Sequence, residues 1–132
     1  MIRKLWSAVF LLTAISIVLG AFGHASQWER HIHPALTGVA PATVQLLALI
    51  WYWVSGTMLV FGLMLIRTLQ RMGRGDRNLR FVPWLIGAFY AVNGAYAALT
   101  VGPFFWLFVV QALLLFVCTW VLQGTAGAAQ AA

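Results

Sequence analysis

Residues 5–23 read LWSAVFLLTAISIVLGAFG, a run of nineteen residues without a charged side chain. A helix needs about 20 predominantly apolar residues to cross the hydrocarbon core of a bilayer. The apolar core of a cleaved signal peptide is shorter, at about 7–15 residues. We therefore expect a retained first transmembrane helix at about residues 5–24.

Three further apolar runs follow, so the chain is expected to cross the membrane four times. The predicted spans are residues 5–24, 42–67, 81–101 and 103–122. They are joined by a loop at 25–41, a basic loop at 68–80 and a tight turn, and a tail follows at 123–132. Short connections between helices favour antiparallel neighbours. The sequence thus predicts an all-α, polytopic membrane protein with a single domain over residues 1–132, folded as an up-down-up-down four-helix bundle.

The composition excludes a soluble protein. Only 8% of the 132 residues are charged and 63% are hydrophobic, whereas soluble domains carry roughly 25% charged residues. The net charge of +6 does not indicate nucleic-acid binding, because the basic residues bracket the apolar runs. A single cysteine, Cys118, excludes an internal disulfide.

The basic residues also predict the orientation of the chain. Arg3, Lys4 and the five arginines from Arg67 to Arg80 would lie on one side of the membrane, against Arg30 alone on the other. Cytoplasmic loops of membrane proteins are enriched in lysine and arginine. We therefore expect both termini in the cytoplasm, the 25–41 loop outside, and a bacterial-type cytoplasmic (inner) membrane.

Uncharged polar side chains recur on one face of each span and are expected in the bundle interior. They are Gln45, Tyr52, Asn93, Tyr96 and Gln111. One interpretation is that they join the helices by hydrogen bonds, as such residues do in membranes. The other is that they bind a small lipophilic ligand together with Trp53. A glycine and alanine stripe, Gly87, Ala91 and Ala95, is expected to pack closely against a neighbouring helix.

The spans themselves contain no acidic or basic side chain away from their ends, which argues against an ion-coupled transporter.

The segment from Gly23 to Pro34, GHASQWERHIHP, holds all three histidines and the only glutamate of the chain. A metal site is a weak alternative here, with His31 and His33 as ligands, because helical spacing separates His24 from His31 by about 10 Å along the axis. A histidine paired with a carboxylate at the membrane interface could act as an acid–base pair, and His24 and Glu29 are the candidates. The remaining interpretation is anchoring, with Trp28, Arg30 and His31 at the level of the headgroups.

These motifs resemble a family of small, uncharacterised bacterial four-helix membrane proteins. His24 and Glu29 after the first span, a proline-containing loop and Trp51-Tyr52-Trp53-Val54-Ser55 are similar to that family's pattern, in which a histidine stands where this chain has Tyr52. The resemblance implies a fold of four helices and carries no function.

Two functions are therefore expected. The first is a non-enzymatic accessory or interaction subunit, or a binder of lipids or small molecules. The second is a small membrane-embedded enzyme or receptor for a lipophilic substrate that uses His24 and Glu29. No cofactor and no nucleic acid is expected; the expected partners are the lipid bilayer and either another membrane protein or further copies of the chain.

Overall fold

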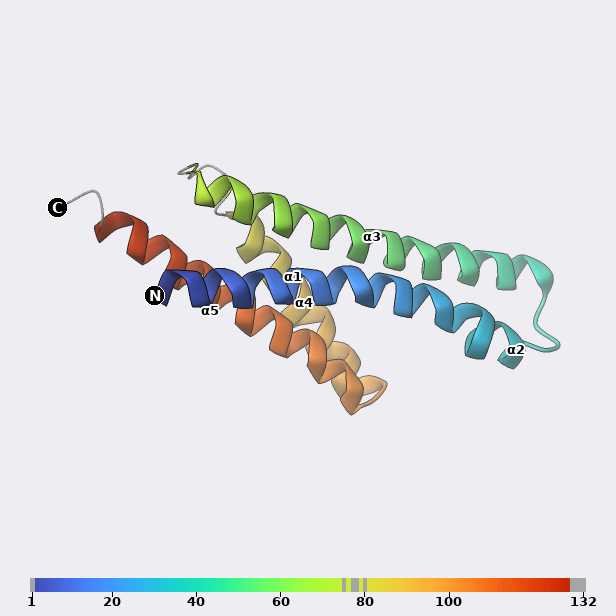
Figure 1. Cartoon of the computed structure of the whole chain (residues 1–132). Coiled ribbons are helices and arrows are strands. Elements are labelled where there is room, and N and C mark those ends of the chain that lie inside the picture. Colours follow the sequence, from blue (N-terminus) through green and yellow to red (C-terminus); the bar gives the residue numbers. More distant parts are fainter. Residues whose placement is uncertain (1, 75, 77–78, 80, 129–132) are drawn as a thin grey trace. The chain divides into compact units, whose positions relative to one another are not determined.

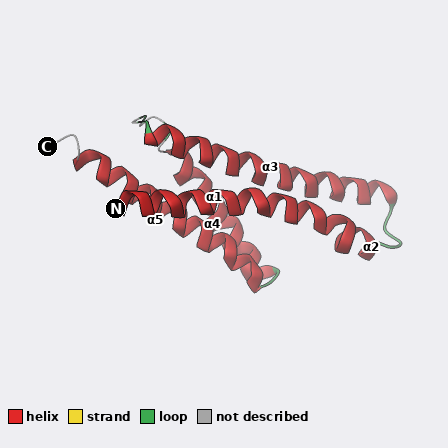
Figure 2. Ribbon diagram, in the orientation of Figure 1, coloured by secondary structure: helices red, strands yellow, loops and turns green. Residues whose placement is uncertain are grey.

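The computed structural model describes residues 2–74, 76, 79 and 81–128. These residues form helices and loops and contain no strand (Figure 2). Four helical stretches are long and apolar enough to cross a membrane, Ile2–Ala35, Pro41–Gly73, Phe81–Thr100 and Pro103–Gly124. The all-α class and the four apolar helices are thus confirmed, whereas the orientation in the membrane stays a prediction.

The first helical stretch is built of three consecutive segments (Figure 1). Helix α1 (Ile2–Gln27) passes into a π-helical turn at Trp28–Ile32, and helix α2 (His33–Ala35) follows directly. The helix therefore runs to Ala35, beyond its expected end at residue 24. The expected loop at 25–41 shrinks to residues 36–40.

The π-helical turn explains how the helix continues as far as Pro34. The backbone N–H of His33 donates to the carbonyl oxygen of Trp28, five residues earlier. A proline has no N–H to donate, and in an α-helix its ring collides with the carbonyl four residues before it. The π turn ends at Ile32, and Pro34 stands in the first turn of α2, where proline is tolerated.

The remaining helices follow the predicted spans more closely. Helix α3 (Pro41–Gly73) begins at its proline and continues through Arg67 and Arg71. Helix α4 (Phe81–Thr100) is followed by a 3₁₀ turn at Pro103–Phe105 and by α5 (Trp106–Ala128). Helix α5 thus extends into the expected tail at 123–132, of which residues 129–132 lie outside the described part of the chain.

The chain divides into two compact units. Ile15–Leu63 forms one unit, in which the second half of α1, the π turn and α2 pair with the first part of α3. Met1–Ala14 and Met64–Ala132 form the other, which contains the hairpin of α4 and α5.

Two glycines allow α4 and α5 to approach each other closely. A Cβ atom at Gly94 would lie 2.8 Å from the Cβ of Phe108 and 3.1 Å from the backbone nitrogen of Val109. A Cβ at Gly87 would lie 2.5 Å from the ring of Phe116. The prediction of close packing at Gly87 agrees with this contact, and Gly94 makes a second close approach; the packing of Ala91 and Ala95 stays a prediction.

Candidate functional site

His24 ties α1 to α3 through three contacts, all within the unit of residues 15–63. Its ring stacks on the ring of Trp51, with centroids 4.1 Å apart and planes inclined by 13°. Its Nδ1 lies 2.8 Å from the hydroxyl oxygen of buried Ser55. The indole Nε1 of Trp51 donates to the carbonyl oxygen of His24 at 2.7 Å.

Trp28 lies at the centre of the aromatic contacts between the two helices. It is only 4% exposed. Its ring centroid lies 6.0 Å from that of His33, 6.3 Å from that of Trp51 and 6.4 Å from that of Tyr52. Its side chain is therefore packed against α3, and an anchoring role at the level of the headgroups stays a prediction.

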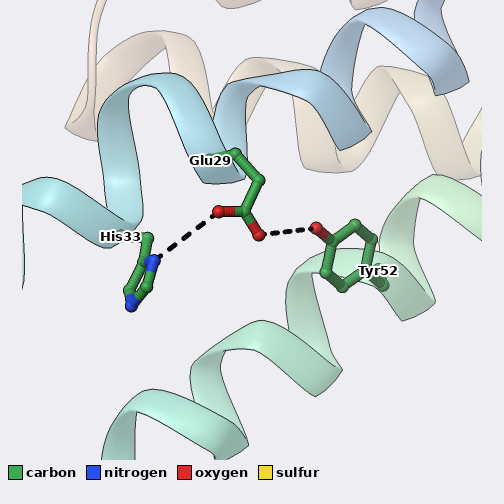
Figure 3. Close-up of polar contacts among 3 residues, drawn as sticks. All are labelled: Glu29, His33 and Tyr52. Atoms are coloured by element: carbon green, nitrogen blue, oxygen red, sulfur yellow. Dashed lines mark hydrogen bonds and ion pairs between the residues drawn. The ribbon is translucent and has the colours of Figure 1, made fainter.

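Next to Trp28, the carboxylate of Glu29 lies between two polar partners (Figure 3). The Tyr52 hydroxyl donates to Glu29 Oε1 at 3.5 Å, and Glu29 Oε2 lies 3.6 Å from His33 Nδ1. The side chains of Glu29 and His33 are 68% and 56% exposed. Strong hydrogen bonds to a carboxylate are shorter, at about 2.7–2.9 Å, so this carboxylate keeps capacity for a further donor. We call Glu29, His33 and Tyr52 the Glu29 cluster.

The π-helical turn places the Glu29 cluster. Glu29 is the second residue of that turn, and His33 directly follows its last residue. Single π turns occur frequently at functional sites. Because helical geometry persists through Pro34, Glu29 and His33 remain neighbours one turn apart.

An open groove adjoins the Glu29 cluster at the connection between α2 and α3. Its volume is about 550 Å³, within the range of small-molecule sites. The lining is mainly apolar, with a few polar side chains. It consists of His33, Pro34, Leu36, Thr37, Val39, Pro41, Val44 and Gln45. His33 thus belongs both to this loop groove and to the Glu29 cluster.

The polar residues that were expected in the interior differ in their burial. Only Gln111 is buried; Gln45, Tyr52, Asn93 and Tyr96 are exposed. Those four side chains therefore do not lie in the interior of their own units. On α4 the packed face is set by Gly87 and Gly94, and Asn93 is rotated from Gly94 by about 100°. Trp53 is also exposed, at 74%.

The expected ligand-binding residues fall into two groups by unit. Tyr52 and Gln45 lie in the Glu29 cluster and the loop groove respectively. Asn93, Tyr96 and Gln111 belong to the other unit. A ligand-binding role for any of them, and for Trp53, stays a prediction.

The two candidate acid–base residues have different partners on α3. His24 contacts Ser55 and Trp51, whereas the carboxylate of Glu29 contacts Tyr52 and His33. A catalytic role for the pair stays a prediction. For the metal alternative, His31 and His33 are two positions apart on a helical backbone, so their side chains leave it on nearly opposite sides. Within the described residues, no three histidine, cysteine or acidic side chains are grouped to hold a metal ion.

Reasoning from the sequence missed Ser55 and Trp51 as the partners of His24. A signal was present in their spacing of four residues, which places both on one face of a helix. The register that brings His24 opposite them is set by the short connection at residues 36–40 and could not be read from periodicity.

The fold and the site define a class: by helix length and hydropathy, the chain is a small multi-pass membrane protein. No protein-family model matches the sequence, and no curated protein or solved structure is detectably similar to it. The resemblance to small bacterial four-helix membrane proteins therefore rests on the short motifs alone.

Proposed function

We propose that this chain is a non-enzymatic membrane protein that binds an amphiphilic molecule, a lipid or a lipophilic small ligand, in the loop groove. One observation carries the proposal: a mainly apolar groove shares His33 with an exposed carboxylate cluster. Ligand sites are typically apolar concavities with a few convergent polar groups. Elsewhere the exposed surface of the described helices is largely hydrocarbon, including Leu46, Leu49 and Val60.

The position of the groove along the helices suits an amphiphile. The stretches Ile2–Ala35 and Pro41–Gly73 contain 34 and 33 residues, which gives each a length of about 50 Å. The hydrocarbon core is only about 30 Å thick. The ends of these helices therefore reach the headgroup region, where the groove can hold an apolar chain beside a polar head.

The contacts of His24 favour binding over catalysis. Its ring is stacked on Trp51 and its Nδ1 is bonded to Ser55, so it acts as a connection between helices. The alternative, an enzyme or receptor that uses His24 and Glu29, is supported by one observation. Both residues contact α3 within a single turn, at Trp51 to Ser55 and at Tyr52.

For the location, we propose the cytoplasmic membrane, with both termini inside and the loop groove on the outer side. The support is the distribution of basic residues, seven against one, together with the general enrichment of arginine and lysine in cytoplasmic loops.

The test of the binding function is native mass spectrometry of the detergent-purified protein, with and without an obstructed groove. Val44 lines the groove, so Val44→Trp should abolish retention of the co-purifying amphiphile. Leu49→Trp is the matched control, because Leu49 lies on the same helix, is 63% exposed and is outside the groove. A parent protein without any retained amphiphile, or equal retention in both variants, would contradict the proposal.

A further inference from the structure

Glu29 is one of two acidic residues in the chain, and the other, Asp76, follows α3 beyond residue 73. The carboxylate of Glu29 lies beside the loop groove, because His33 belongs both to the groove lining and to the Glu29 cluster. The charge of Glu29 is therefore the local feature that selects the head of an amphiphile bound there. Like charges repel and opposite charges attract across such an interface, so the head should be cationic at this point.

The distances within the Glu29 cluster indicate the kind of cation. Glu29 Oε2 and His33 Nδ1 are 3.6 Å apart, and Glu29 Oε1 and the Tyr52 hydroxyl are 3.5 Å apart. These separations are long for direct hydrogen bonds to a carboxylate. A small donor group can therefore lie beside the carboxylate. The same group can reach a neighbouring acceptor atom of the cluster. A primary ammonium has three N–H donors, and the acceptors available are the carboxylate oxygens and the tyrosine hydroxyl oxygen.

We infer that the loop groove and the Glu29 cluster bind an aminophospholipid, with its primary ammonium on Glu29. The inference rests on the proposed function and names the ligand's chemical class. A quaternary ammonium has no N–H to donate to these acceptors, and a head with a net negative charge is repelled by the carboxylate. The site should therefore prefer phosphatidylethanolamine to phosphatidylcholine and phosphatidylglycerol.

The experiment is competition between these three lipids, with identical acyl chains, for the purified protein, read by native mass spectrometry. We expect the parent to retain phosphatidylethanolamine about tenfold better than phosphatidylcholine, the size expected for a charge-assisted hydrogen bond. Glu29→Gln should remove the preference. Asp76→Asn is the matched control, because it removes the chain's other acidic side chain, and it should keep the preference.

The outcomes separate this inference from the proposed function. If the lipids bind equally to the parent and Val44→Trp still blocks them, the groove binds amphiphiles but the assignment of the head is wrong. If no lipid is retained, both proposals fail. If Glu29→Gln loses binding of all three lipids to the same extent, while its helical circular dichroism signal is unchanged, the assignment of the ammonium to Glu29 is wrong.

Discussion

Ser55 has one hydroxyl hydrogen, and the hydroxyl donates it to the carbonyl oxygen of Trp51 at 3.0 Å. The Nδ1 of His24, 2.8 Å from the same hydroxyl oxygen, must then carry a hydrogen and donate it. The hydrogen-bond network thus places a hydrogen on Nδ1. His24 joins α1 to α3 through a bond that its own stacking on Trp51 orients.

Ser55→Ala should destabilise the protein by about 0.6–2 kcal/mol, the range of interhelical hydrogen bonds in membranes. Thr57→Ala is the matched control, because the Thr57 hydroxyl makes the same type of bond to the carbonyl four residues earlier, at Trp53, and the sequence places it half a turn from Ser55. The measurement is the free energy of unfolding in mixed micelles. A loss no larger than that of Thr57→Ala would show that the His24 bond contributes nothing.

At this scale the sequence predicts which residues carry chemistry better than it predicts their partners. His24 and Glu29 are conspicuous because so few side chains here are ionisable. Glu29 and His33 are also recognisable as neighbours at a spacing of four. The partners Ser55, Trp51 and Tyr52 depend on the register between two helices, to which hydrophobic periodicity is insensitive. The burial of Trp28 follows from the same register.

Among the elements, the existence of the four apolar helices follows from hydropathy, but some of their boundaries do not, and the largest departure is at the end of the first helix. A proline normally ends a helix at the preceding residue, so the sequence predicts a stop before Pro34. The π turn at Trp28–Ile32 allows the helix to continue to Ala35. This helix that continues past a proline carries the Glu29 cluster. Departures from local sequence preferences are expected at functional sites.

The α4–α5 hairpin provides a test of close helix packing. Gly94→Ala should destabilise the protein by about 1–3 kcal/mol, the usual cost of overpacking, because the added Cβ would meet the backbone of α5 at Val109. Gly56→Ala is the control, since nothing lies within 4 Å of a Cβ at that position, and its stability should be unchanged or slightly higher. Unfolding free energies of the two variants check this, and equal values would refute the close approach.

For the whole molecule, the amino-acid composition predicts a lipid bilayer as the environment, but it says little about how the helices pack. The scarcity of charge requires a bilayer, and the structure supplies four helices of the right length and hydropathy. Polar residues on predicted faces do not reveal which faces pack, because lipid tails and neighbouring helices are equally apolar. Glycines proved the better guide in the α4–α5 hairpin, since a missing side chain directly permits backbone contact.

The orientation is the remaining property of the whole chain that its charges predict. In a Cys118→Ala background, Thr37→Cys should react with a membrane-impermeant maleimide in intact cells, because Thr37 is exposed at the 36–40 connection. Arg74→Cys, exposed just after α3, should react only after the membrane is permeabilised. The expectation follows from seven basic residues on one side against Arg30 on the other. Labelling of Arg74→Cys alone in intact cells would reverse the orientation and place the loop groove in the inner leaflet, so the aminophospholipid would have to be supplied from the cytoplasmic side.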